Sequence, residues 1–484
     1  MDTRMHCKLQ HFKPLSVTNK HGTFSMSDFP SSRFERSARI AKTGIRVGAN
    51  YAMHHFKKKL SRNGNDANGS DSTLHSANAR YMYEEFSKLR GTALKLAQTL
   101  SLDHGLLPDE FVDVMSQAQY RVPPISRVLI RQIIKDELGS FPEDIFSKFE
   151  MQATAAASIG QVHEAVLPDG RPVMVKIQYP NVRVSIGSDL SMAKLVFKRM
   201  VKSDQTDAYF NEVFNKMMEE TDYLNEGAQI SFFRRLYESR KFAVPEYLPE
   251  YSTSRILTMT SIRGRHLPEF LAAKPDQASR NHYGQLLWDF FHAQINDTRT
   301  LHADAHPGNY MLCDDGRLGI LDFGCIKECP SDFFFDYVSL MPLHLEGKRE
   351  QLADLYVKLG LIRESDMQTE PEKRFFELCK SFGDLVISPY RHKFFDFGNA
   401  EFSETYKKLV MEAVSQPEPR GTHHFIYVTR AHIGLYRMLM QLGAVINPSE
   451  GREHVLSWYH GAGKNTELAG PDTKPAAASS QKAG

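Results

Sequence analysis

LHADAHPGNYMLCDDGRLGILDFGC, residues 301–325, carries three polar side chains in order: Asp304, Asn309 and Asp322. Asn309 follows Asp304 at an interval of five residues, and Asp322 opens an Asp-Phe-Gly triplet. Enzymes that transfer phosphoryl groups use one Asp to orient or deprotonate the acceptor, and an Asn and a second Asp to hold Mg²⁺. The order and spacing therefore predict a phosphoryl-transfer site, with Asp304 as a catalytic residue and Asn309 and Asp322 as metal ligands.

The middle of this stretch predicts a β-hairpin. Residues 310–312 and 318–321 are apolar, and an Asp-Asp-Gly turn separates them. Such a hairpin would bring Asn309 and Asp322 to the same end of a pocket. Two other interpretations of His302 and His306 are an incidental surface position and a zinc site. The cysteines that follow lack paired CxxC spacing, which disfavours zinc.

A second motif precedes this stretch. The string AAASIGQV, residues 155–162, fits the pattern GxGxxGxV, with alanine in the first two glycine places. A loop of this kind covers the phosphates of a bound nucleotide with backbone N–H groups. Alone, the match is weak, because Ala-rich strings are common. The candidate nucleotide-binding residues are Ala155, Ala156, Ala157, Ser158, Gly160 and Val162.

The context strengthens this match. Residues 163–166, a Pro-Asp-Gly turn and residues 172–177 predict a second hairpin, and its second strand carries Lys176. Protein kinases place a lysine there to bind the α- and β-phosphates, and a glutamate on a helix holds that lysine. Residues 189–237 predict such a helical segment. Its candidate partners for Lys176 are Glu219, Glu220 and Glu226, of which we prefer Glu226.

The composition sets broad limits. A chain of 484 residues can form a two-lobed enzyme with extensions, and a net charge of +2 gives no indication of nucleic-acid binding. Five cysteines without regular spacing favour a reducing compartment. There is no apolar run of about 18 residues, so no membrane-spanning helix is expected. The expected location is the cytoplasm, with peripheral membrane contact as an option.

The N-terminal part is expected to hold accessory elements. Residues 33–60 predict a basic amphipathic helix, which suits either a membrane surface or partner, or simply a solvated helix face. A polar linker, residues 63–78, follows. Lys95 and Gln98 lie three positions apart on a predicted helix, and their residue types alone indicate only a solvated face.

The C-terminal part is expected to be helical. It has no Ala-Pro-Glu signature of an activation loop. A second Asp-Phe-Gly triplet, residues 396–398, has no catalytic loop before it, so we interpret it as a packing element or turn. Residues 432–446 predict an amphipathic core helix.

Taken together, the motifs resemble the UbiB/ADCK (aarF-domain) family of atypical protein-kinase-like proteins. The resemblance rests on AAASIGQVH, VMVKIQYPNV, the acids Glu220 and Asp222, HADAHPGN and ILDFG. The KxGQ signature of the family appears as KLAQ, with Ala97 in place of glycine. The resemblance implies that Lys95 and Gln98 pack over the site where a protein kinase takes its peptide, with Glu220 and Asp222 among their partners. These four would be regulatory residues.

The resemblance further implies ATP and Mg²⁺ as cofactors and a role in isoprenoid quinone or related lipid metabolism. A true small-molecule or protein kinase and a nucleotide-binding pseudokinase scaffold are the alternatives. Expected partners are a nucleotide, lipid or quinone precursors and a biosynthetic complex, without nucleic acid.

The fold class that we predict is α+β, a bilobal protein-kinase-like fold with an N-terminal helical extension and a helix-rich C-terminal lobe. The expected parts are a flexible segment, basic helix and linker (1–79), a KxGQ-type helical extension (80–140), an N-lobe (141–264), a helical C-lobe (265–458) and a disordered tail (459–484).

Overall fold

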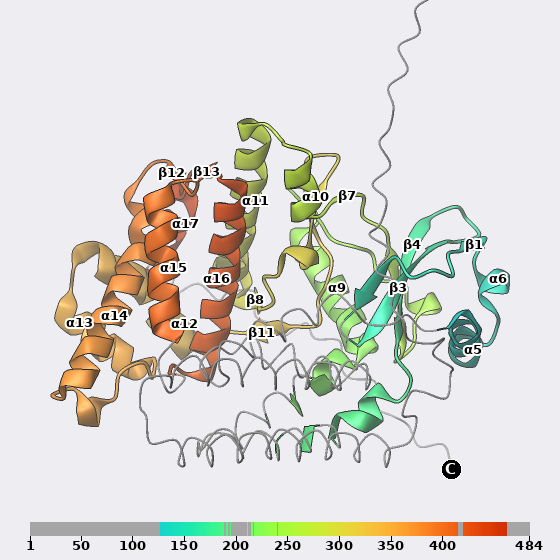
Figure 1. Cartoon of the computed structure of the whole chain (residues 1–484), viewed down its shortest axis with the longest axis horizontal. Helices are drawn as coiled ribbons and strands as arrows, with labels where there is room; N and C mark the ends of the chain where they lie inside the picture. The colour runs from blue at the N-terminus through green and yellow to red at the C-terminus, as the bar shows by residue number, and fades with distance from the viewer. Residues whose placement is uncertain are drawn as a thin grey trace, which may run out of the picture.

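The computed structural model describes residues 126–157, 159–187, 190–191, 194, 211, 214–215, 217–239, 241–414 and 420–461. These residues form an α+β structure with a small lobe and a larger helical lobe, which confirms the predicted fold class (Figure 1). The expectations for the basic helix, the linker, Lys95, Gln98, Ser158 and the tail from residue 462 onward fall outside the described residues.

The small lobe is built on an antiparallel sheet in the order β1-β3-β4-β6, with β2 paired to β3. Its strands are β1 (Lys148–Phe149), β2 (Ala155–Ala157), β3 (Gly160–Val166), β4 (Pro172–Gln178) and β6 (Ile256–Thr260). The hairpin of β3 and β4 agrees with the sequence prediction, because a Pro-Asp-Gly turn joins two short runs that each contain β-branched residues. The sequence predicts a loop at the alanine string, whereas residues 155–157 form strand β2, which pairs with β3.

Helices α5 (Arg127–Leu138), α6 (Pro142–Ile145) and α9 (Tyr223–Tyr237) accompany this sheet. Ser126 caps the start of α5, and Gly139, in the left-handed conformation, ends it. The buried isoleucines of α5 are spaced three to four residues apart, so one face of the helix enters the core. Thr253, which precedes β6, donates a hydrogen bond to Glu137 of α5 at 2.6 Å. Helix α5 therefore belongs to the packing of the small lobe (Figure 1).

A central four-stranded sheet has the order β5-β10-β9-β7. Its strands are β5 (Phe242–Ala243), β7 (Gly264–Arg265), β9 (Tyr310–Cys313) and β10 (Leu318–Ile320). The β9–β10 hairpin is the one predicted around the Asp-Asp-Gly turn. Helix α9 contacts both β6 of the small sheet and β5 of the central sheet, so it joins the two lobes.

The larger lobe is mainly helical and lies on the left of Figure 1. Its α-helices are α10 (Leu267–Ala272), α11 (Gln277–Ala293), α12 (Ser331–Glu346), α13 (Arg349–Lys358), α14 (Glu370–Ile387), α15 (Ala400–Val414), α16 (His423–Leu442) and α17 (Ser449–Tyr459). Its strand pairs are β8 (Thr300–His302) with β11 (Ile326–Glu328), and β12 (Phe395–Asp396) with β13 (Val445–Ile446). Its short helical turns are η4 (Gln294–Thr298), η5 (Pro307–Asn309), η6 (Glu364–Asp366) and η7 (Ser388–Arg391), whereas η3 (Pro249–Tyr251) lies beside β6 of the small sheet.

The helix expected over residues 432–446 has different bounds. Helix α16 ends at Leu442, because Gly443 adopts φ +56° and turns the chain out of the helix. Val445 then enters β13, where its backbone N–H donates to the side chain of Asn281 on α11 at 2.8 Å. The second Asp-Phe-Gly triplet is a packing element, as interpreted: Phe397 is fully buried, and its ring centroid lies 5.0 Å from that of Tyr436.

Within the described residues, no helix combines the length and the apolarity that crossing a membrane requires.

We predict that Gly284→Ala destabilises the helical lobe. A Cβ atom at Gly284 on α11 would lie 2.4 Å from the Cβ of Ala444, so α11 and the α16–β13 turn would have to move apart. The expected loss in the free energy of unfolding is about 1 to 3 kcal/mol, measured by chemical denaturation. Gly187→Ala is the control, because this helical glycine has its nearest neighbour at 3.9 Å. Equal losses in the two variants would contradict the prediction.

Candidate functional site

A cleft of about 730 Å³ lies between the small lobe and the β9–β10 hairpin. The small lobe contributes Ala155, Ala157 and Val162 to its walls, and the hairpin side contributes Met311 and Leu321. Four of the polar residues that line it are Lys176, Glu226, Asn309 and Asp322. The structure therefore brings together, in one cleft, four candidate site residues that lie up to 146 positions apart, from Lys176 to Asp322.

The base of the cleft holds a buried ion pair. The Nζ atom of Lys176 lies 2.8 Å from Oε1 and 2.9 Å from Oε2 of Glu226. Lys176 is 7% exposed and Glu226 is 3% exposed. Asp222 caps the start of α9 by accepting a hydrogen bond from the backbone N–H of Asn225 at 3.1 Å, which places Glu226 in the first turn. Of the three glutamates considered, Glu226 is the one that contacts Lys176.

Asp322 completes this cluster from the larger lobe. Its Oδ2 atom lies 3.6 Å from Nζ of Lys176, and its Oδ1 atom accepts a hydrogen bond from the backbone N–H of Gly324 at 2.9 Å. The Nε2 atom of His302 contacts the backbone oxygen of Asp322. His302 therefore supports the Asp-Phe-Gly segment from β8, which favours a structural role over a role as a zinc ligand.

The electrostatics of the three groups are coupled. Burial raises the pKa of Glu226 to about 7, and the charge of Asp322 adds to this rise against the attraction of Lys176. Burial disfavours the charged form of Lys176, but Asp322 and Glu226 outweigh it and raise its pKa above the usual value. Burial likewise opposes ionisation of Asp322, yet Lys176 and the N–H of Gly324 hold its pKa below the usual value. With both carboxylates ionised the cluster is net negative, so it favours a further cation.

Asn309 and Asp304 lie together at the end of the β9–β10 hairpin. The side-chain amide of Asn309 donates to Oδ2 and to the backbone oxygen of Asp304, both at 3.0 Å. The backbone N–H of Leu321 donates to the backbone oxygen of Asn309 at 3.0 Å, which ties this loop to the strand before Asp322. Carboxylate and amide oxygens are the ligands that Mg²⁺ prefers. The donor set of Asp322 and Asn309 therefore fits a magnesium ion.

The alanine segment, residues 155–157, forms one edge of the cleft. Ala155 pairs with Val162 and Ala157 pairs with Gly160, so the chain reverses tightly between β2 and β3. At Gly160 a Cβ atom would lie 2.3 Å from the backbone oxygen of Ile177, which only glycine avoids. Ala155 and Ala157 line the cleft, while the side chains of Ala156 and Ser158 fall outside the described part.

The acids of the ExD motif have separate positions. Asp222 is the N-cap of α9. Glu220 lies beside Gly324 of the Asp-Phe-Gly triplet, where its Cγ atom would be 3.9 Å from an added Cβ. Their expected partners Lys95 and Gln98 are not among the residues that the structure describes.

Two contributors were not found from the sequence. Tyr223 is fully buried, and its ring centroid lies 5.1 Å from Nζ of Lys176, so the ring packs beside the ammonium group. Gly434 on α16 lets that helix approach the loop that carries Asp304, because a Cβ there would lie 2.4 Å from the backbone oxygen of Ala305. No local pattern marks either residue, since each acts through a contact distant in sequence.

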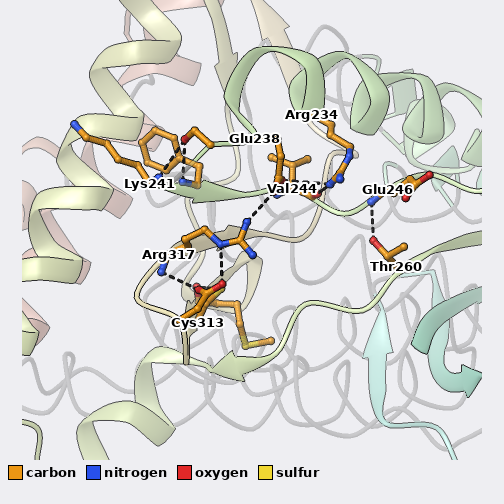
Figure 2. Close-up of polar contacts among 12 residues, drawn as sticks. Arg234, Glu238, Lys241, Val244, Glu246, Thr260, Cys313 and Arg317 are labelled. Carbon is orange, nitrogen blue, oxygen red and sulfur yellow. Dashed lines mark hydrogen bonds and ion pairs between the residues drawn. The ribbon is translucent and has the colours of Figure 1, made fainter. Parts of the chain in front are cut away.

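The far end of α9 is also fixed to the larger lobe, as Figure 2 shows. Glu238 directly follows α9, and its Oε1 atom accepts a hydrogen bond from Arg317 of the β9–β10 turn at 2.7 Å. Its Oε2 atom accepts one from the backbone N–H of Val244 at 2.6 Å. Within the helix, the ring of Phe233 lies 5.2 Å from that of Phe323 in the Asp-Phe-Gly triplet. The helix that carries Glu226 is thus connected to the hairpin that carries Asn309.

Comparison with known proteins identifies the domain that contains this cleft. A family model described as the ABC1 atypical kinase-like domain matches residues 117–356, which contain the whole cleft. The chain belongs to this UbiB/ADCK family of atypical kinase-like proteins. Family members and this chain therefore share a kinase-like domain.

Two curated family members are similar over most of the chain. The atypical kinase COQ8, mitochondrial, of Saccharomyces cerevisiae is 28% identical over 88% of this chain and 85% of its own length. The probable serine/threonine-protein kinase abkA of Dictyostelium discoideum is 26% identical over 86% of this chain and 78% of its own.

A solved structure is also similar. The complex structure of Rv3197 with erythromycin from Mycobacterium tuberculosis has a TM-score of 0.57 and 25% identity, covering 85% of this chain and all of that one.

We predict that Glu226 makes stability depend on pH. Its pKa is raised from 4.5 to about 7, so the folded protein binds more protons than the unfolded chain between these values. Its stabilising contribution is complete below about pH 4.5 and is lost as the pH rises through about 7. Glu226→Gln lacks this titration. Its free energy of unfolding, taken relative to that of the parent, should therefore rise by roughly 1 to 3 kcal/mol between pH 5 and pH 8, measured by chemical denaturation.

Glu219→Gln is the control, because the side chain of Glu219 is 49% exposed and pairs with Lys327 at the surface. A parallel pH profile for the parent and Glu226→Gln would contradict the prediction.

Proposed function

We propose that this chain binds ATP together with Mg²⁺ and acts on the terminal phosphoryl group, as an ATPase or an atypical kinase. The observation that supports this best is the buried pair of Lys176 and Glu226, with Asp322 3.6 Å from Nζ of Lys176 across the cleft. A lysine held by a helix glutamate and facing an Asp-Phe-Gly aspartate is the arrangement that kinases use for ATP.

Each residue has a proposed task. Lys176 binds the α- and β-phosphates, and Glu226 keeps its ammonium group in place. Asp322 and Asn309 would hold Mg²⁺, which when bound neutralises charge on the phosphate oxygens. Asp304 accepts a proton from, or orients, the attacking water or acceptor hydroxyl. The backbone of the alanine segment, from Ala155 to Val162, covers the phosphates.

The hydrogen bond from Asn309 to Asp304 supports this division of tasks. It fixes the orientation of the Asp304 carboxylate beside the proposed metal site, since Asn309 donates to its Oδ2 at 3.0 Å. An oriented carboxylate next to the transferred group is what a general base requires. Glu220 and Asp222, beside the Asp-Phe-Gly segment and at the start of α9, are proposed to contact Lys95 and Gln98 and so regulate access of the acceptor.

We further propose a role in isoprenoid quinone synthesis or related lipid metabolism. The family resemblance and the similarity to COQ8 support this role. A comparison of quinones and other lipids between cells with and without the chain tests it. Unchanged levels of every isoprenoid quinone would contradict the proposed pathway and leave the ATP chemistry to be judged by its own test.

For the ATP site, we predict different effects for the two aspartates. Asp322→Asn should remove the Mg²⁺-dependent part of stabilisation by ATP, measured by thermal-shift titration with and without Mg²⁺. Asp304→Asn should keep this stabilisation but lower ATP turnover about 10²- to 10⁴-fold, the range for loss of a general base.

The matched control is Asp396→Asn. Asp396 opens the second Asp-Phe-Gly triplet and accepts a hydrogen bond from Gly398, just as Asp322 accepts one from Gly324, but it lies outside the cleft. Absence of any stabilisation of the parent by ATP would refute the proposal. ATP binding without turnover would instead support the pseudokinase scaffold.

We also propose reversible contact with a membrane surface through residues 33–60, whose sequence has many basic and few acidic residues. Near an anionic bilayer each cation contributes on the order of 1 kcal/mol. The intact chain should therefore float with anionic vesicles more than with neutral ones, and less at high salt.

A chain beginning at Asn78 is the comparison in this flotation experiment. Equal flotation of both chains would show that residues 33–60 are not the anchor.

A further inference from the structure

The ammonium group of Lys176 has an aromatic neighbour besides its two carboxylates. Nζ of Lys176 lies 5.1 Å from the ring centroid of Tyr223. A cation within about 6 Å of such a centroid is attracted by the negative face of the ring. Tyr223 is fully buried and is not one of the described residues that line the cleft. The ring therefore reaches a nucleotide only through the lysine.

The start of α9 places this ring. Tyr223 is the first residue of the helix, and Glu226 follows it by three positions, so both side chains lie on one helix face. Asp222 fixes where the helix begins by capping it. Leu224, between them in sequence, is 50% exposed and lies on another face. One capped turn thus presents a carboxylate and an aromatic ring to the same ammonium group.

The hydroxyl of Tyr223 does not account for this position. It is buried and has no hydrogen-bond partner among the described residues. It lies beside the turn between β2 and β3, since a Cβ atom at Gly160 would be 3.0 Å from its oxygen. Burial also raises the pKa of Tyr223 above its usual value, so the phenol stays neutral. The feature that Tyr223 offers to Lys176 is therefore an uncharged aromatic face.

An uncharged partner suits a lysine that must bind phosphates. Asp322, 3.6 Å from Nζ of Lys176, is the residue that we assign to Mg²⁺, so the metal would share its charge with the lysine. A further carboxylate beside Lys176 would repel the phosphates that the lysine attracts. An aromatic ring attracts the ammonium group without adding a negative charge, and its packing keeps it in place.

We propose that Tyr223 is a positioning residue, whose ring face holds the ammonium group of Lys176 in the orientation that binds the nucleotide phosphates. This inference rests on the ATP function proposed above. It adds a residue that acts through the lysine and does not touch the nucleotide.

Calorimetric titration of the full chain with Mg²⁺-ATP and with adenosine tests this role. Adenosine has no phosphates, so its binding does not use Lys176. Tyr223→Leu should weaken ATP binding roughly 2- to 30-fold, the range for loss of a cation–π contact, and leave adenosine within about twofold of the parent. Tyr223→Phe keeps the ring and should restore ATP binding to within about twofold of the parent.

Tyr237→Leu is the matched control. Tyr237 is a buried tyrosine at the other end of α9, and its ring packs on Phe233 at 5.4 Å between centroids. Its loss should change ATP and adenosine binding to the same extent. Equal weakening of both ligands by Tyr223→Leu would overturn the proposal, because a purely structural role affects both. A Tyr223→Phe variant as weak as Tyr223→Leu would overturn the role of the ring.

Fluorinated phenylalanines at position 223 provide a test that does not need the leucine variant to fold. Each added fluorine weakens the negative face of the ring while its shape changes little. Affinity for Mg²⁺-ATP should therefore fall stepwise from phenylalanine to the most fluorinated ring, and affinity for adenosine should stay constant. An ATP affinity that is independent of fluorine number would overturn the proposal.

A double-mutant cycle separates this inference from the proposed function, because it needs no nucleotide. Tyr223→Leu and Lys176→Met are combined, and the unfolding equilibrium is measured by chemical denaturation. The two changes should be coupled by a factor of roughly 2 to 30 in that equilibrium constant. Absence of coupling in a chain that binds ATP would overturn this inference alone. A parent chain that does not bind ATP would overturn the proposed function and, with it, the phosphate-binding task of Tyr223.

Discussion

The buried contact between Lys176 and Glu226 is the interaction on which the cleft depends. It joins a central strand of the small sheet to α9, and it removes two charges from water. Such a pair is stable only where the geometry is good and further polar groups satisfy the charges. Asp322 supplies one such group from the larger lobe, so the same ammonium group links β4, α9 and the segment after β10.

The architecture around this cluster holds α9 at both ends. At its start, Asp222 caps the helix and Glu226 faces the lysine. At its end, Glu238 joins Arg317 of the β9–β10 turn. Between them, Phe233 packs on Phe323 next to Asp322. A shift of α9 would therefore move its contacts with Lys176, with the Asp-Phe-Gly segment and with the β9–β10 hairpin together.

Helix α16 has a comparable position in the larger lobe. Gly434 brings it against Ala305, next to Asp304. The loop that carries Asp304 thus packs directly against this helix. The packing of α11 on the same helix, through Gly284 and Ala444, extends this packing to β13.

Local patterns in the sequence were enough to determine several elements. The two hairpins, β3–β4 and β9–β10, follow from turn residues between short apolar runs, because turn type and strand alternation are set by neighbouring residues. The β9–β10 hairpin likewise explains why Asn309 and Asp322 lie near each other, since Asn309 comes at its start and Asp322 follows its end. The tertiary structure decided what depends on distant contacts. It selected Glu226 among three glutamates, 50 residues from its lysine, and it ended α16 at Leu442, where α11 supplies partners for the chain that follows. It also placed the ring of Tyr223 beside the ammonium group of Lys176, because such a position arises only when separate helices and strands pack together.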